Sequence, residues 1–118
     1  MRPGREAFPL MSDVHEVHER IDELQLVDVR EPYEVEAGRI DGVIHIPLNA
    51  LLAGGEAGRL DPDRPVVAIC KVGSRSELAA LMLQARGYDA QNMDGGMEAW
   101  EAAGYPFSGA DGGPGKVL

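Results

Sequence analysis

The chain has 118 residues and one cysteine, Cys70, whose neighbours favour ionisation of its thiol. Lys71, Val72, Gly73, Ser74 and Arg75 follow it, a short run with two cations and a flexible glycine. Backbone N–H groups of such a loop can curl around an anion, and the amino end of a helix adds partial positive charge. A thiol in such surroundings has a pKa of roughly 3.5–7.5. We therefore predict that Cys70 is largely thiolate at neutral pH and can act as a nucleophile.

The segments on either side of Cys70 predict how it is held. Residues 66–69 are apolar and mostly β-branched, which is typical of a strand buried on both faces. Ser74 and Glu77 have the spacing of a capping box, which predicts a helix beginning just after Ser74. The helix is expected to run from 76 to 86 and to end at Gly87. Its core-facing residues are predicted to be Leu78, Leu81, Met82 and Ala85.

In the rest of the chain, predicted strands alternate with predicted helices. Strands are predicted over residues 24–29, 43–46 and 90–93, with a short edge strand over 7–11. Helices are predicted from Ser12 or Asp13 to Leu24, then over 32–37, 48–52 and 96–103. Such alternation indicates a parallel α/β sheet, and ligands of these sheets bind at the carboxyl ends of the strands. Asp28, Cys70 and Asp94 are all expected there.

The two ends of the chain are expected to lie outside this pattern. Residues 1–5 are predicted to be a loose end. One domain is predicted over residues 1–107, and it includes this loose end. Residues 108–118 contain four glycines and a proline, so a disordered tail is predicted for them.

Charge and composition exclude several classes of function. The formal net charge is −9 and the pI about 4.6, which argues against a nucleic-acid-binding protein. A single cysteine fits a reducing compartment. The start of the chain does not have the pattern of a signal peptide, and no apolar run approaches membrane-spanning length. We expect a cytoplasmic monomer without a membrane or nucleic-acid partner. His15 and His18 have no third ligand nearby, so no metal site is predicted.

Four motifs in order give the chain a resemblance to a known family. They are LVDVREP at 26–32, GRIDGVIHIP at 38–47, CKVGSRS at 70–76 and DGGMEAW at 94–100. Together they resemble the signatures of a single-domain rhodanese, a sulfurtransferase. The resemblance implies a rhodanese-like α/β fold, in which a five-stranded parallel sheet is flanked by helices on both faces. It implies no cofactor.

The same resemblance implies a reaction. Sulfane sulfur would pass from a donor such as thiosulfate to a thiophilic acceptor through a persulfide on Cys70. The acceptor would be cyanide in vitro and a thiol in the cell. Residues 71–75 would bind the substrate and the persulfide, with Arg75 and Lys71 stabilising the anions. The negative net charge opposes the approach of dianionic thiosulfate, so a small persulfide or a persulfide-carrying protein is the more natural donor.

Asp28 and Arg30 allow two interpretations. In the structural one, Asp28 accepts hydrogen bonds from neighbouring backbone N–H groups and Arg30 pairs with Glu34. In the functional one, both rim the pocket. The sequence favours the structural interpretation.

The chain departs from the family pattern at five positions, where other residue types are common. Four of them lie outside the loop and bear on packing or partner choice, namely Arg39, Asp41, Val43 and His45. The fifth, Val72, lies in the loop and removes a side chain that could hydrogen-bond the bound sulfur.

Two other functions compete with sulfur transfer. One is a non-catalytic rhodanese-fold interaction or regulatory domain, which the intact Cys70, Gly73 and Arg75 disfavour. The other is a cysteine phosphatase or an arsenate reductase. Phosphatase loops of the resembling type hold one more residue between cysteine and arginine, whereas four residues lie between Cys70 and Arg75 here. The shorter ring suits a sulfur atom better than a phosphoryl group.

Overall fold

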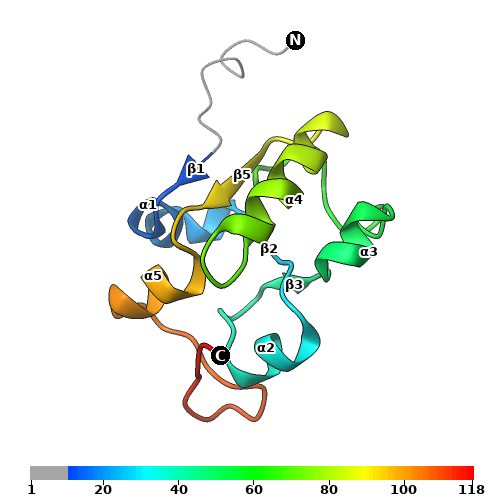
Figure 1. The fold of residues 1–118 in the computed structure, drawn as a ribbon. Coiled ribbons are helices and arrows are strands. Elements are labelled where there is room, and N and C mark those ends of the chain that lie inside the picture. The colour runs from blue at the N-terminus through cyan, green and yellow to red at the C-terminus, as the bar shows by residue number, and fades with distance from the viewer. Residues whose placement is uncertain (1–10) are drawn as a thin grey trace.

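The computed structural model describes residues 11–118 and contains a five-stranded parallel sheet in the order β1-β5-β4-β2-β3 (Figure 1). The strands are β1 (Met11–Ser12), β2 (Gln25–Asp28), β3 (Ile44–His45), β4 (Val66–Ile69) and β5 (Ala90–Met93). The central strand β4 aligns Ile69 with Asp28 of β2, so the carboxyl ends of these strands meet at one edge. The predicted loose end at 1–5 and nearly all of the predicted strand at 7–11 lie outside the described residues.

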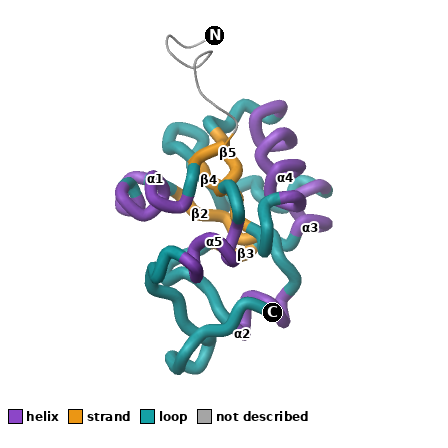
Figure 2. Tube along the Cα trace, turned by 60° about the vertical axis from the view of Figure 1, so that its left-hand side comes forward, coloured by secondary structure: helices purple, strands orange, loops and turns teal. Residues whose placement is uncertain are grey.

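Helices cover both faces of the sheet (Figure 2). They are α1 (Val14–Glu19), the 3-10 helix η2 (Ile21–Glu23), α2 (Pro32–Ala37), α3 (Leu48–Leu52), α4 (Ser74–Ala85) and α5 (Gly96–Ala102). The helices α1 and α5 pack together on one face, and α3 and α4 pack on the other. The predicted parallel α/β sheet between two helical layers is confirmed. Within residues 11–118, no helix has the length and apolar character needed to cross a membrane.

Strand β4 contributes to both apolar cores. Its residues alternate between the faces, with Val66 and Ala68 in the core under α4 and Val67 and Ile69 in the core under α5. Full burial of each valine or isoleucine side chain stabilises the fold by about 1.5–3 kcal/mol. Cys70 continues the alternation into the α4 core, so its backbone position is set by the best-buried strand of the sheet.

The amino end and the buried face of α4 differ from the prediction. Gly73 is the N-cap, with a left-handed φ of 109°, and no side chain caps the helix, so the Ser74–Glu77 capping box is wrong. The face against the sheet consists of Ser76, Ala79, Ala80 and Leu83. Leu78 and Leu81 are 43% and 47% exposed, and Ala85 is exposed, while Met82 packs partly against the core. Small residues let the helix approach the sheet closely, and the loop before it sets its rotation.

The first helix is also shorter than predicted. Asp13 caps α1 by accepting a hydrogen bond from the backbone N–H of Glu16 at 2.8 Å, but α1 ends at Glu19. A separate 3-10 turn then leads into β2.

The glycine-rich segment 108–118 folds back on the protein, contrary to the predicted disordered tail. Ser108 forms a bridge with Arg39, and the backbone N–H of Lys116 donates to the carbonyl of Ala37 at 2.9 Å. Val117 packs against the α5 core. Figure 1 shows the carboxyl terminus beside α2. Composition alone missed these backbone pairings because their partners, Arg39 and Ala37, lie 69 and 79 residues earlier in the chain.

Candidate active site

Cys70 lies directly after β4, at the carboxyl edge of the sheet, and is fully buried. Its Sγ accepts a hydrogen bond from the backbone N–H of Gly73 at 3.0 Å and one from the hydroxyl of Ser76 at 3.2 Å. The predicted position of the cysteine between a strand end and a helix start is therefore confirmed. Donors surround the sulfur on its loop side, as an anionic sulfur requires.

The amino end of α5 holds the loop in this shape. The carbonyl of Cys70 accepts from the N–H of Met97 at 2.9 Å, and that of Lys71 accepts from the N–H of Glu98 at 3.0 Å. Gly96 permits the contact, since an added Cβ would lie 2.5 Å from both carbonyl oxygens. With these carbonyls turned toward α5, the following N–H groups are left to face the sulfur.

The pKa of the Cys70 thiol reflects two opposing effects. Burial raises it, because a charged sulfur loses its hydration. Hydrogen bonds from the Ser76 side chain and from the N–H groups of Ser76, Gly73 and Val72 lower it, and their sum outweighs burial. The net pKa lies below the ordinary value of a thiol, in the direction that the sequence predicts.

A second side chain positions the Ser76 hydroxyl. Asn92 of β5 contacts this hydroxyl through Oδ1, and its Nδ2 donates to the carbonyl of Gly73 at 3.1 Å. Because Asn92 Oδ1 can only accept, Oδ1 and Cys70 Sγ share the single hydroxyl hydrogen of Ser76. Ser76 and Asn92 were not among the predicted site residues. Their signal in the sequence is polarity on a buried helix face and in a buried strand.

Arg75 lies in the first turn of α4, and its side chain contacts α2. Its Nη1 and Nη2 donate to Oε1 and Oε2 of Glu34 at 2.7 and 2.9 Å. The pair lowers the pKa of Glu34 and raises that of Arg75, in each case through the hydrogen bonds first. The sequence predicts that Arg75 stabilises a bound anion and that Glu34 pairs with Arg30, whereas in the structure Arg75 and Glu34 pair with each other.

The other loop residues form its rim. Lys71 is partly exposed, and its Nζ lies 3.9 Å from Oε2 of Glu98. Val72 is 50% exposed, and Ser74 is exposed. Lys71 thus lies at the exposed edge of the loop, whereas the Ser74 side chain is turned to solvent, so Ser74 contributes to the loop through its backbone.

Asp28 and Arg30 form a buried pair at the carboxyl end of β2. The Asp28 carboxylate accepts from the backbone N–H of Arg30 at 3.1 Å and from Nε and Nη2 of its side chain at 2.9 and 2.7 Å. Arg30 Nη2 also donates to the carbonyl of Gly38 at 2.7 Å. Both side chains are 0% exposed, which supports the structural interpretation. The predicted pairing of Arg30 with the Glu34 side chain does not form, because Arg75 takes the Glu34 carboxylate; Arg30 Nη1 instead donates to the backbone carbonyl of Glu34 at 3.4 Å.

The histidines lie away from this site or support it through the backbone. His15 Nδ1 contacts the hydroxyl of Tyr105 at 2.6 Å, and His18 stacks on the same ring. His45 Nε2 donates to the carbonyl of Arg30 at 2.8 Å, so this departure from the family pattern still braces the segment after β2. Among residues 11–118, no group of three or more metal-ligating side chains occurs.

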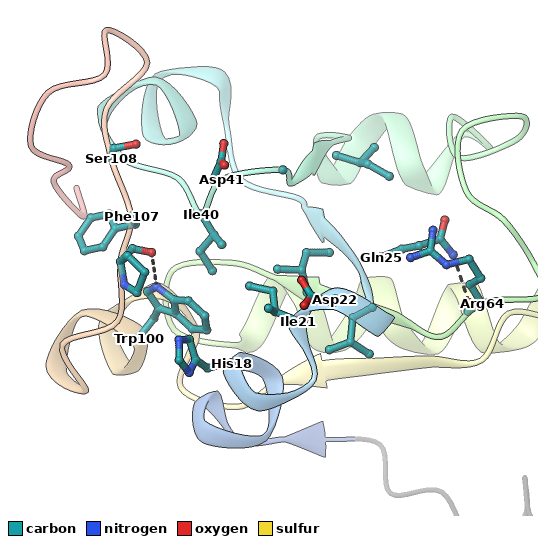
Figure 3. A pocket seen from close by; sticks show the side chains of 15 residues that line it. His18, Ile21, Asp22, Gln25, Ile40, Asp41, Arg64, Trp100, Phe107 and Ser108 are labelled. Carbon is teal, nitrogen blue, oxygen red and sulfur yellow. Dashed lines mark hydrogen bonds between the residues drawn. The ribbon is translucent and has the colours of Figure 1, made fainter.

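A cavity of about 590 Å³ lies at the opposite end of the strands (Figure 3). It opens beside the starts of β2 and β3 and is walled by Trp100, Phe107, Ile40 and Arg64. No residue of the loop 70–76 lines it. It is therefore separate from the site around Cys70.

Comparison with known proteins agrees with this site. The Rhodanese-like domain family matches residues 13–103. YtwF of Bacillus subtilis (strain 168), named as a sulfurtransferase, is 39% identical over 85 residues, which cover 72% of this chain and 81% of that protein. MoeZ of Mycobacterium tuberculosis, named as an adenylyltransferase/sulfurtransferase, is 38% identical over 78 residues, but these are 65% of this chain and only 20% of MoeZ.

A solved structure agrees in fold. The crystal structure of a rhodanese-related protein from Thermoplasma volcanium superposes with a TM-score of 0.79 at 30% identity and covers 85% of this chain and 98% of that one. Sequence, fold and the position of the cysteine loop thus lead to one assignment. This chain belongs to the rhodanese-like domain family.

Proposed function

We propose that the protein is a sulfurtransferase that carries sulfane sulfur as a persulfide on Cys70. The observation that carries the proposal is the pair of hydrogen bonds to Sγ, from the N–H of Gly73 and the hydroxyl of Ser76. They stabilise a thiolate without a separate general base, and the neighbouring N–H groups of the loop can stabilise a terminal sulfur in the same way.

The reaction has two displacement steps. The Cys70 thiolate attacks the sulfane sulfur of the donor, the S–S bond of the donor breaks, and the leaving group takes the electron pair. With thiosulfate the leaving group is sulfite. An acceptor nucleophile, cyanide in vitro or a thiol, then attacks the outer sulfur and regenerates the thiolate. Neither step requires a cofactor or a metal.

Burial of Cys70 supports sulfur as the transferred group. The residue is 0% exposed, so a donor must present its reacting atom on a narrow end to reach Sγ. A terminal sulfane sulfur meets this requirement. A tetrahedral phosphoryl or arsenate group would need a wider ring of N–H donors around it.

Intact mass measurement tests the proposal. Incubation with thiosulfate should add one sulfur atom to the protein, and cyanide should remove it. Cys70→Ser should take up no sulfur and lose all transfer to cyanide, because a serine hydroxyl stays protonated. Residual transfer by this variant would refute the assignment. No adduct with any sulfane donor would favour a non-catalytic domain, and phosphate-ester hydrolysis that is lost in Cys70→Ser would favour a phosphatase.

A further inference from the structure

The contact between Arg75 and Glu34 binds the arginine of the cysteine loop to α2. Both terminal nitrogens of Arg75 donate to both oxygens of Glu34, which is the strongest geometry for this type of pair. Glu34 Oε1 also accepts the backbone N–H of Glu31 at 3.0 Å. The Glu34 side chain is 4% exposed, whereas that of Arg75 is 35% exposed. The carboxylate is therefore the fixed partner.

The pairing changes the charge that a donor meets. Arg75 faces Glu34, and the other loop cation, Lys71, has Glu98 at 3.9 Å. Two positive charges are thus matched by two negative ones, in a chain of formal net charge −9. An anion at Sγ is stabilised by backbone N–H groups and by Ser76, with little help from net positive charge.

We propose that Glu34 determines the class of donor. By neutralising Arg75, it disfavours dianionic thiosulfate and leaves hydropersulfides of thiols, R–S–SH, as the preferred donors. The proposal rests on the sulfur-transfer function above and assigns Glu34 as a specificity-determining residue that acts through Arg75.

The two donors differ in the charge they bring. In the hydropersulfide reaction the Cys70 thiolate attacks the outer sulfur of R–S–SH, and the S–S bond of the donor breaks. The leaving group R–S⁻ takes the electron pair, and the product is Cys70–S–SH. One negative charge is present before and after. In the thiosulfate reaction the thiolate and the dianion bring three negative charges together, and the persulfide anion and sulfite retain all three. A free guanidinium beside the sulfur would favour mainly the second reaction.

Glu34→Gln is the variant that tests whether the charge of Glu34 affects the thiosulfate reaction more than the hydropersulfide reaction. The glutamine keeps the shape of the side chain and a carbonyl that can accept the N–H of Glu31, but it removes the negative charge. Glu36→Gln is the matched control, because Glu36 lies on the same helix, is exposed and loses the same charge. The rate constant for loading of Cys70 is measured by intact mass, with thiosulfate and with the persulfide of 2-mercaptoethanol.

Glu34→Gln should raise the loading rate constant for thiosulfate about tenfold, while that for the persulfide should change less than about threefold. Glu36→Gln should leave both within about twofold, as expected for a screened surface charge. Equal changes for the two donors, or no gain with thiosulfate, would overturn the proposal and leave Glu34 with a purely structural role.

Two further measurements keep the inference testable if Glu34→Gln folds poorly or if no sulfur is transferred. The natural protein should load from the persulfide at least about tenfold faster than from thiosulfate, and a preference for thiosulfate would overturn the proposal. Alkylation by iodoacetamide needs no sulfur donor. An unmasked Arg75 should lower the pH midpoint of Cys70 alkylation in Glu34→Gln relative to Glu36→Gln. Absence of loading from either donor would instead contradict the proposed function itself.

Discussion

At the scale of single residues, hydrogen-bond donors rather than free cations stabilise the cysteine sulfur. Gly73 and Ser76 donate to Sγ, while the arginine of the loop, Arg75, is paired with Glu34. Fixed donors in a buried site stabilise an anion strongly, since no solvent has to reorganise around it. The reactivity of Cys70 should therefore depend more on Ser76 than on surface charge.

Ser76→Ala should raise the pKa of Cys70. The Ser76 hydroxyl is the largest of the effects that lower this pKa, and without it burial is opposed only by the backbone N–H groups. The pH midpoint of alkylation should move up, and sulfur loading at neutral pH should fall. Ser74→Ala is the control, because the Ser74 hydroxyl is exposed and should leave the midpoint unchanged. Equal midpoints for the two variants would contradict the assigned hydrogen bond.

The lowered pKa also predicts a dependence of stability on pH. Because the folded-state pKa of Cys70 lies below the ordinary value of 9.0, the thiolate stabilises the fold fully above that value. The contribution declines as the pH falls toward the folded-state pKa and is lost below it. Denaturant titrations of the natural protein and of Cys70→Ser should therefore diverge as the pH rises, and parallel curves would show that the thiol is not perturbed.

At the scale of elements, the amino end of α5 sets the shape of the cysteine loop. Its first N–H groups bind the carbonyls of Cys70 and Lys71, and Gly96 lets the two backbones meet. This contact turns the remaining loop N–H groups toward the sulfur. The motif DGGMEAW at 94–100 thus belongs to the site through its backbone.

Gly96→Ala should damage both stability and the site. An added Cβ would meet the backbone of Cys70 and Lys71 at 2.5 Å, in addition to the strain of a φ of 59°. We expect a loss of about 3 kcal/mol in the free energy of unfolding and a higher pKa for Cys70. Gly104→Ala is the control, because it has a φ of 78° and nothing within 4 Å of the added atom. It should cost only about 1 kcal/mol, and equal losses from the two variants would show that α5 does not press on the loop.

At the scale of the whole molecule, the negative charge opposes anionic donors. Half of the twenty acidic residues lie between 13 and 41, in the part of the chain that includes α2 and Glu34. Long-range repulsion slows the encounter with a dianion and is screened beyond about 8 Å at physiological ionic strength. The local pairing of Arg75 and the distant charges therefore act in the same direction.

Added salt should accordingly raise kcat/KM for thiosulfate and leave kcat/KM for a neutral hydropersulfide nearly unchanged. The gain should come mainly through a lower KM, because salt affects the approach more than the displacement. Rates measured over a series of potassium chloride concentrations check this. A decline with salt would show that Lys71 and Arg75 attract the donor despite their carboxylate partners.

Much of the architecture was predictable from short stretches of sequence. The alternating strands and helices follow from hydrophobic periodicity, and α2 spans 32–37 as predicted, with Pro32 as its first residue and Gly38 as its C-cap. The cysteine loop was predictable because strand, glycine turn and helix start all lie within ten residues. These features depend on residues that are neighbours in the sequence, so they do not require knowledge of the tertiary structure.

The partners of the site residues were decided only by the tertiary structure. Glu34 and Arg75 lie 41 residues apart, and Ser76 and Asn92 lie 16 apart. They meet because β4 lies between β2 and β5, so that the segments following these strands converge at one edge. The sequence itself determined that Cys70 would sit in an anion-stabilising loop of an α/β sheet. The tertiary structure decided which donors reach the sulfur and that a buried carboxylate neutralises Arg75, because strand order, rather than spacing along the chain, brings those groups together.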